Sequence, residues 1–168
     1  MNDSPNIILA IAPGKRELGI AAFAGVDLVY VSVKTITHGK SRKSMQKEIT
    51  DILHKLFAGF PIKTVVIKAI SQYQKQSPDL ERIVERVRLE SEKKSVPVEE
   101  VTLEQIKFVL CQNERTTEKK AFEAIVNSYP ELARYWDRPN KWQNDYYAFL
   151  FSAVAVGAVY LKTLSETD

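Results

Sequence analysis

The chain has few of the residue types from which disulfides and metal clusters are built. It contains one cysteine, Cys111, and two histidines, His38 and His54. A single cysteine excludes a disulfide within the chain and a metal cluster held by cysteines. The two histidines are too far apart in the sequence to suggest a metal pair. The phosphate-binding pattern GxxxxGK(S/T) and the nucleophile elbow GxSxG are both missing.

Long hydrophobic runs are also missing. The N-terminal MNDSPN is polar and lacks the apolar centre of a secretory signal, so we expect a reducing, cytoplasmic location. The longest apolar run, Ala148–Leu161, is shorter than the roughly 20 residues that a membrane-spanning helix needs. This run is typical of a helix buried against a sheet, and we expect no membrane partner.

The composition is that of one soluble globular domain covering residues 1–168. Hydrophobic residues make up 45% of the chain and charged residues 27%, which is enough apolar material for one substantial core. The net charge is +3 and the isoelectric point about 8.9. This mildly basic balance permits nucleic-acid binding without arguing for it, because binding domains commonly concentrate charge more strongly.

The pattern of apolar residues predicts an α/β domain. Three strands open the chain, and a helix then leads to a fourth strand that we expect to lie parallel to the first. The order βββαβαβααα predicts a mixed five-stranded sheet with helices on both faces. The expected strands are Asn6–Ala12, Leu18–Ala24, Leu28–Thr35, Lys63–Ile70 and Val96–Val101, and the expected helices Ser41–Phe57, Pro78–Lys93, Leu103–Leu110, Glu118–Asn127 and Asp145–Leu164, the last preceded by a loop over Asp137–Asn144.

Four stretches resemble, in order, the motifs of one protein family. ILAIAPGKRELGIAAF is an apolar strand, a Pro-Gly turn and a second strand, and TVVIKAI is a later apolar strand. VTLEQIKFVL is followed by EKKAFEAIV, in which Lys119 lies at a helix start, and SAVAVGA lies in the last helix. The ordered set resembles the RuvC-type Holliday-junction resolvases of the RNase H-like superfamily. The resemblance implies a three-layer RNase H-like domain.

The resemblance also implies a set of acidic residues that this sequence does not have. In the family, carboxylates hold two Mg²⁺ ions that activate water and stabilise the leaving oxygen. When the family's carboxylates are placed residue by residue on this sequence, the aspartate of the first strand falls on Ala12. The glutamate of the fourth strand falls on Lys68, and the aspartate of the last helix on Ser152. A further acidic position falls near Phe149. The resemblance therefore implies a resolvase-like protein that has lost its metal site and needs no cofactor.

Each of the three positions also has a purely structural interpretation. Ala12 could be a small core residue at a strand end, and Ser152 a small residue that lets a helix approach the sheet. Lys68 could be exposed at a sheet edge, but its strand is otherwise apolar on both faces. A lysine in a buried strand usually keeps a partner, and Asp145 is a candidate.

Two segments carry basic residues that suit nucleic acid. HGKSRKSMQK, residues 38–47, contains basic residues and no acidic one. This composition fits a phosphate-binding site at a helix start and a solvated loop without a ligand equally well. RYWDRPNKWQNDYY, residues 134–147, interleaves basic and aromatic residues, a mixture that can stack bases. We interpret Trp136 as an anchor of the loop. The candidate nucleic-acid-binding residues are Lys15, Arg16, Lys40, Arg42, Lys43, Lys119, Arg138, Lys141 and Trp142.

Three functional hypotheses follow. The first is a non-catalytic protein that binds branched or structured nucleic acid or acts as a scaffold. The second is an active Mg²⁺-dependent endonuclease with relocated acids, Asp145 with Glu17. The third is a protein-interaction module without nucleic-acid contact, in which the apolar stripe Leu80–Val87 serves a homodimer or another partner.

Overall fold

A five-stranded mixed sheet forms the centre of the computed structural model, which describes residues 5–37, 42–71 and 77–167. The strand order is β3-β2-β1-β4-β5, with β1 antiparallel to β2 and parallel to β4. The predicted mixed α/β sheet is therefore confirmed. The strands are β1 (Ile7–Pro13), β2 (Glu17–Ala24), β3 (Asp27–Thr35), β4 (Ile62–Lys68) and β5 (Val98–Val101).

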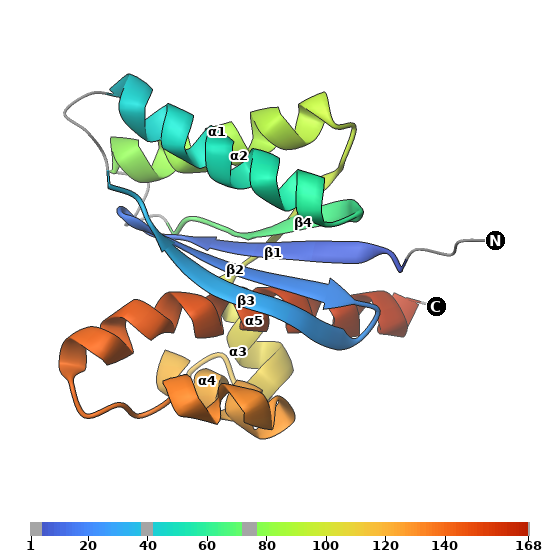
Figure 1. Ribbon diagram of the computed structural model, residues 1–168. Coiled ribbons are helices and arrows are strands. Elements are labelled where there is room, and N and C mark those ends of the chain that lie inside the picture. The colour runs from blue at the N-terminus through green and yellow to red at the C-terminus, as the bar shows by residue number, and fades with distance from the viewer. Residues whose placement is uncertain (1–4, 38–41, 72–76, 168) are drawn as a thin grey trace.

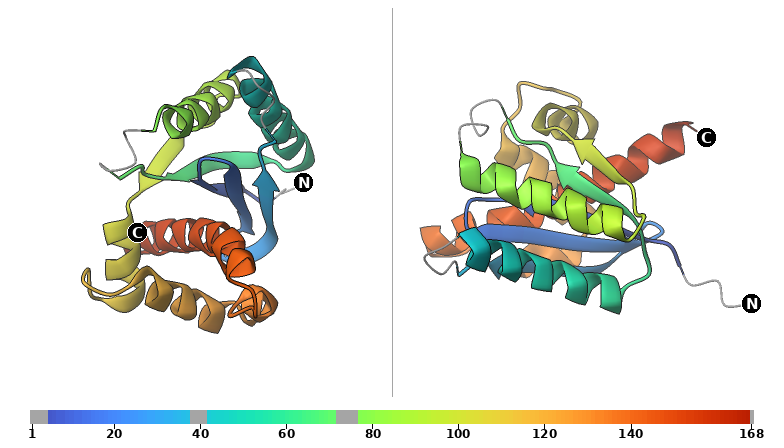
Figure 2. Two further views of the ribbon diagram at one scale, coloured as in Figure 1. Left: turned by 90° about the vertical axis from the view of Figure 1, so that its left-hand side faces the viewer. Right: turned by 90° about the horizontal axis from the view of Figure 1, so that it is seen from above.

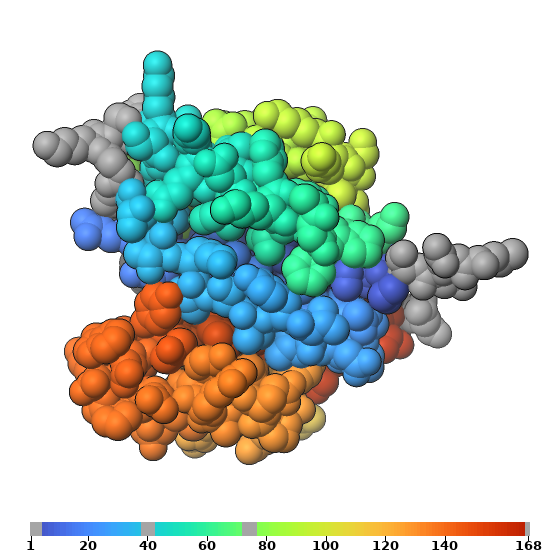
Figure 3. Space-filling view, viewed as in Figure 1, coloured from blue at the N-terminus to red at the C-terminus, as the bar shows by residue number. Residues whose placement is uncertain are grey.

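Helices cover both faces of the sheet, as the sequence predicts (Figures 1 and 2). One face carries α1 (Arg42–Gly59) and α2 (Pro78–Lys93). The opposite face carries α3 (Leu103–Cys111), α4 (Glu118–Ser128) and α5 (Lys141–Thr167). In the space-filling view, β3 lies exposed between the two helical layers (Figure 3).

In the region before α5, one element was not predicted and one prediction was wrong. The segment Pro130–Tyr135 forms a 3₁₀ helix, η2, that the sequence pattern did not indicate. The last helix begins at Lys141, inside the predicted loop, so Lys141 and Trp142 lie in its first turn. The backbone carbonyl of Asn140 accepts hydrogen bonds from the amides of Gln143 and Asn144, which closes this turn without any apolar periodicity.

Helix α5 lies against the sheet because small residues allow a close approach. A Cβ on Gly19 of β2 would lie 2.0 Å from the Phe149 carbonyl oxygen, and one on Gly157 would lie 2.1 Å from the Phe23 ring. By length and composition α5 could cross a membrane, but residues 150–159 are buried inside the protein. It is the core helix that the apolar run predicts.

The apolar stripe of α2 is used inside the protein rather than on its surface. Leu80, Ile83 and Val87 are buried, and the last two pack in the core between α1 and the sheet. The stripe is therefore not the exposed interface that the protein-interaction hypothesis requires. Whether the protein forms a homodimer through another surface stays a prediction. Helical periodicity identifies an apolar face, but the tertiary structure decides which element covers it.

Candidate functional site

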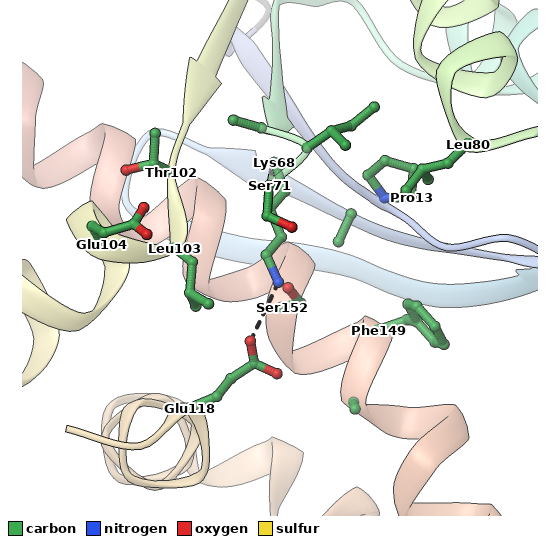
Figure 4. A pocket seen from close by; sticks show the side chains of 14 residues that line it. Pro13, Lys68, Ser71, Leu80, Thr102, Leu103, Glu104, Glu118, Phe149 and Ser152 are labelled. Atoms are coloured by element: carbon green, nitrogen blue, oxygen red, sulfur yellow. Dashed lines mark hydrogen bonds and ion pairs between the residues drawn. The ribbon is translucent and has the colours of Figure 1, made fainter. Parts of the chain in front are cut away.

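A pocket of about 700 Å³ opens where the carboxyl ends of β1 and β4 meet α5 and the first turns of α3 and α4 (Figure 4). Ile11 pairs with Ile67 in parallel register, so Ala12 and Lys68 lie next to each other at the carboxyl ends of neighbouring strands. Helix α5 adds Ser152 from below the sheet. The structure thus brings Ala12, Lys68 and Ser152 into one pocket. The lining residues are Ala12, Pro13, Lys68, Ala69, Ile70, Ser71, Leu80, Thr102, Leu103, Glu104, Glu118, Ala148, Phe149 and Ser152.

The ammonium of Lys68 extends into this pocket and forms an ion pair with Glu118. Its Nζ lies 3.4 Å from Glu118 Oε2, and the Lys68 side chain is 20% exposed (Figure 4). Asp145, the partner suggested by the sequence, is exposed and does not line the pocket. The sequence could not indicate Glu118, because only the packing of α4 places it opposite a strand 50 positions away.

The N-terminus of α4 holds Glu118 in place. Thr117 caps this helix, since its side chain accepts a hydrogen bond of 3.2 Å from the backbone amide of Lys120. Glu118 is then the first residue of the helix, where the helix dipole favours a carboxylate. The charge of Lys68 is therefore balanced by a carboxylate that the local structure itself stabilises.

Ser152 contributes a buried polar atom to the pocket. The residue is 4% exposed, and among the described residues its Oγ has no hydrogen-bond partner. Phe149, one turn earlier on α5, closes the side next to the Pro-Gly turn, because its ring would contact any side chain at Gly14. The pocket therefore has a hydroxyl ready to donate or accept a hydrogen bond, beside an aromatic wall.

The residues that line this pocket do not fit a pair of magnesium ions. Such a site requires carboxylate oxygens, but Ala12 supplies no donor and Ser152 only a neutral one. The carboxylates in the lining belong to Glu104 and Glu118, and the second is paired with an ammonium that would repel a divalent cation. Within the described residues there is no group of three or more His, Cys, Asp or Glu that could hold a metal ion.

Comparison with solved structures identifies the fold. RuvC from Thermus thermophilus superposes with a TM-score of 0.75 at 16% identity, over 96% of this chain and 97% of that one. This chain has a RuvC-like fold. The T. thermophilus RuvC in complex with a Holliday junction substrate gives a TM-score of 0.76 at 14% identity, over 96% and 97% of the two chains. No protein-family model and no curated protein sequence matches the chain.

A third similar structure comes from yeast. The yeast mitochondrial Holliday junction resolvase gives a TM-score of 0.67 at 10% identity, over 97% of this chain and 82% of that one. Because these identities are low, the likeness concerns the fold alone. The chemistry of the pocket has to be inferred from the residues that line it in this chain.

On the RuvC-like fold, the two acids of the endonuclease hypothesis are outside the lining of the pocket. Neither Glu17 nor Asp145 lines it, and the described part of the chain shows no hydrogen bond or ion pair between them. Glu17 begins β2, while Asp145 lies in α5 ahead of Phe149. The structure gives no support to a catalytic pair made from these two residues.

The predicted basic residues are scattered over the surface of the RuvC-like fold. Lys15 and Arg16 are exposed on the β1–β2 turn, which follows Pro13 of the pocket. Trp142 is 67% exposed. Lys43, Lys119, Arg138 and Lys141 are also exposed, whereas Lys40, His38 and the side chain of Arg42 lie outside the described residues.

Proposed function

We propose that this protein binds branched or structured nucleic acid and does not cleave it. The observation that carries the proposal is the Lys68–Glu118 ion pair in the pocket, at a position where the family resemblance implies a metal-binding carboxylate. The fold supports it, since one similar structure is a RuvC complex with a Holliday junction substrate and another is a Holliday junction resolvase.

Lys68 brings an ammonium into the pocket, opposite Glu118. Its ammonium has three donors, and one ion pair with Glu118 leaves others for a phosphate oxygen. The pocket lacks a set of carboxylates that would position metals and activate water, so a phosphodiester held there would stay intact. Lys15 and Arg16, exposed on the turn that follows Pro13 of the same pocket, would add attraction for the backbone of the strand.

Binding and cleavage are tested on one set of DNA substrates. Fluorescence anisotropy would compare a four-way junction with a linear duplex of the same length, and gels would follow cleavage in Mg²⁺ and in Mn²⁺. We expect tighter binding to the junction, weakened by salt, with no cleavage. Lys68→Met should weaken junction binding several-fold, whereas Lys162→Met, an exposed lysine near the far end of α5, should not.

Two outcomes would overturn the proposal. Robust cleavage that a chelator abolishes would show an enzyme. Binding to neither junction nor duplex at low salt would leave a scaffold or protein-interaction role instead. Circular dichroism of both lysine variants would confirm that they remain folded, because Lys68→Met removes a partly exposed ion pair and leaves an apolar side chain in an apolar strand.

A further inference from the structure

A second pocket adjoins the first, and four of its nine lining residues are aromatic. Its volume is about 330 Å³, within the roughly 300 to 1,000 Å³ typical of ligand sites. It shares Glu118 and Ala148 with the larger pocket. The lining residues are Glu118, Lys119, Phe122, Tyr135, Trp136, Asp137, Asn144, Ala148 and Phe151.

The aromatic rings are fixed by contacts with one another. Trp136 meets Phe151 edge to face, with ring centroids 5.2 Å apart and an interplanar angle of 84°. Phe151 stacks on Phe122 at 5.8 Å, and both are buried. Tyr135 and Trp136 remain partly exposed at the pocket, while Tyr135 packs on Tyr147 at 4.9 Å. The pocket therefore offers ring surfaces whose orientation is set before a ligand arrives.

The loop that closes the pocket is held by hydrogen bonds to one side chain. Asn144 Oδ1 accepts from the Arg138 amide at 2.8 Å, and its Nδ2 donates to the Arg138 carbonyl at 2.9 Å. Asp137, just before, has a φ of +52°, in the left-handed region that non-glycine residues seldom adopt. Backbone strain of this kind persists where the surrounding structure fixes it, and it gathers at ligand sites.

The polar residues of the pocket offer one donor group and one acceptor group. Lys119 supplies an ammonium and Asp137 a carboxylate, and neither forms an ion pair with a residue that the structure describes. The charge of Glu118 is already balanced by Lys68. A quaternary ammonium ligand would be repelled by Lys119. A nucleobase suits the pocket better, because it has flat faces for stacking and an edge that carries both donors and acceptors.

We propose that this aromatic pocket binds one unpaired nucleobase of a strand whose phosphate lies in the neighbouring Lys68 pocket. The inference rests on the proposed nucleic-acid function and adds a subsite to it. The shared lining residues Glu118 and Ala148 make the two pockets neighbours, so that phosphate and base can belong to adjoining parts of one strand. Trp136 is then a binding residue and not only an anchor of the loop.

The test places a fluorescent base where it can enter the pocket. The full chain would be titrated with a four-way junction that carries one unpaired 2-aminopurine beside the crossover, and with the same junction carrying an abasic residue there. We expect quenching of 2-aminopurine on binding and about tenfold weaker binding of the abasic junction. Trp136→Leu should abolish the quenching, whereas Phe108→Leu, at an exposed aromatic ring outside both pockets, should preserve it.

The abasic junction keeps the test decisive even if Trp136→Leu destabilises the protein, because the abasic junction is compared on the unchanged protein. Equal affinity for the two junctions, with no change in fluorescence, would overturn the proposal while junction binding itself stands. Competition by free deoxyadenosine monophosphate as strong as by the strand would assign the pocket to a free nucleotide and overturn it as well. Failure to bind any junction would remove both this inference and the proposed function.

Discussion

Lys68 lies at the end of a strand whose other side chains are mostly apolar, and its charge needs a partner there. The sequence predicts that need, since TVVIKAI is apolar on both faces. It suggests the wrong partner, because Asp145 shares a helix face with Ser152 whereas Glu118 reaches the pocket only through the packing of α4. At the scale of the residue, the chemistry of the pocket depends on one ammonium opposite one carboxylate.

Introducing carboxylates should change what the pocket binds. In the triple variant Ala12→Asp, Lys68→Glu and Ser152→Asp, three acids would face one another in a largely buried pocket. Their mutual repulsion and burial should lower the melting temperature in chelator, and Mn²⁺ should raise it again by binding the folded form. Thermal unfolding with and without Mn²⁺ measures both effects. A melting temperature of the triple variant that Mn²⁺ leaves unchanged would show that these positions do not form a metal site.

At the scale of the element, α1 and α2 are joined by a buried carboxylate. Glu90 of α2 is 2% exposed; its carboxylate lies 3.0 Å from His54 Nε2 of α1 and 3.1 Å from Lys93 Nζ. Burial works to raise the pKa of Glu90, but the hydrogen bonds and charges of Lys93 and His54 outweigh it and hold that pKa below the ordinary 4.5. Sequence periodicity predicts both helices, but this pairing depends on their packing.

The lowered pKa of Glu90 makes its contribution to stability depend on pH. Because the folded protein holds this carboxylate ionised more strongly than the unfolded chain does, the stabilisation is present above pH 4.5 and is lost as the pH falls through the folded pKa. Glu90→Gln should lower the free energy of unfolding by about 1 to 2 kcal/mol at pH 7, and by less at pH 3. Urea denaturation at both values measures this.

Glu85→Gln, on the same helix, is the control for Glu90→Gln. Glu85 is exposed and has no ion pair with a described residue, so its substitution should change stability little at either pH. If Glu90→Gln destabilises equally at both pH values, the effect comes from packing and not from the ionised carboxylate.

At the scale of the whole molecule, the net charge of +3 is too small to attract nucleic acid strongly from a distance. Where the lysines and arginines lie therefore matters more than their number. Lys15 and Arg16 lie in the β1–β2 turn that follows Pro13, a residue of the Lys68 pocket, while other cations, such as Lys94 and Lys162, lie towards the far ends of α2 and α5.

The dependence of junction binding on salt should report this placement. Each phosphate contact contributes about 0.9 to the slope of log K against log salt concentration. The double variant Lys15→Ala, Arg16→Ala should reduce that slope by about 2. The double variant Lys94→Ala, Lys162→Ala lowers the net charge equally and should leave the slope unchanged. Equal effects of the two double variants would mean that binding follows the net charge and not a defined site.

The amino-acid sequence by itself determined the order of strands and helices, the mixed sheet, and the resemblance that singles out Ala12, Lys68 and Ser152. These follow from local periodicity and turn residues, which act between neighbours in the chain. Only the tertiary structure decided that Glu118 pairs with Lys68, that the α2 stripe is covered by the core, and that Tyr135 and Trp136 line a pocket. Such contacts join residues far apart in the sequence, and they exist only once the helices have packed on the sheet.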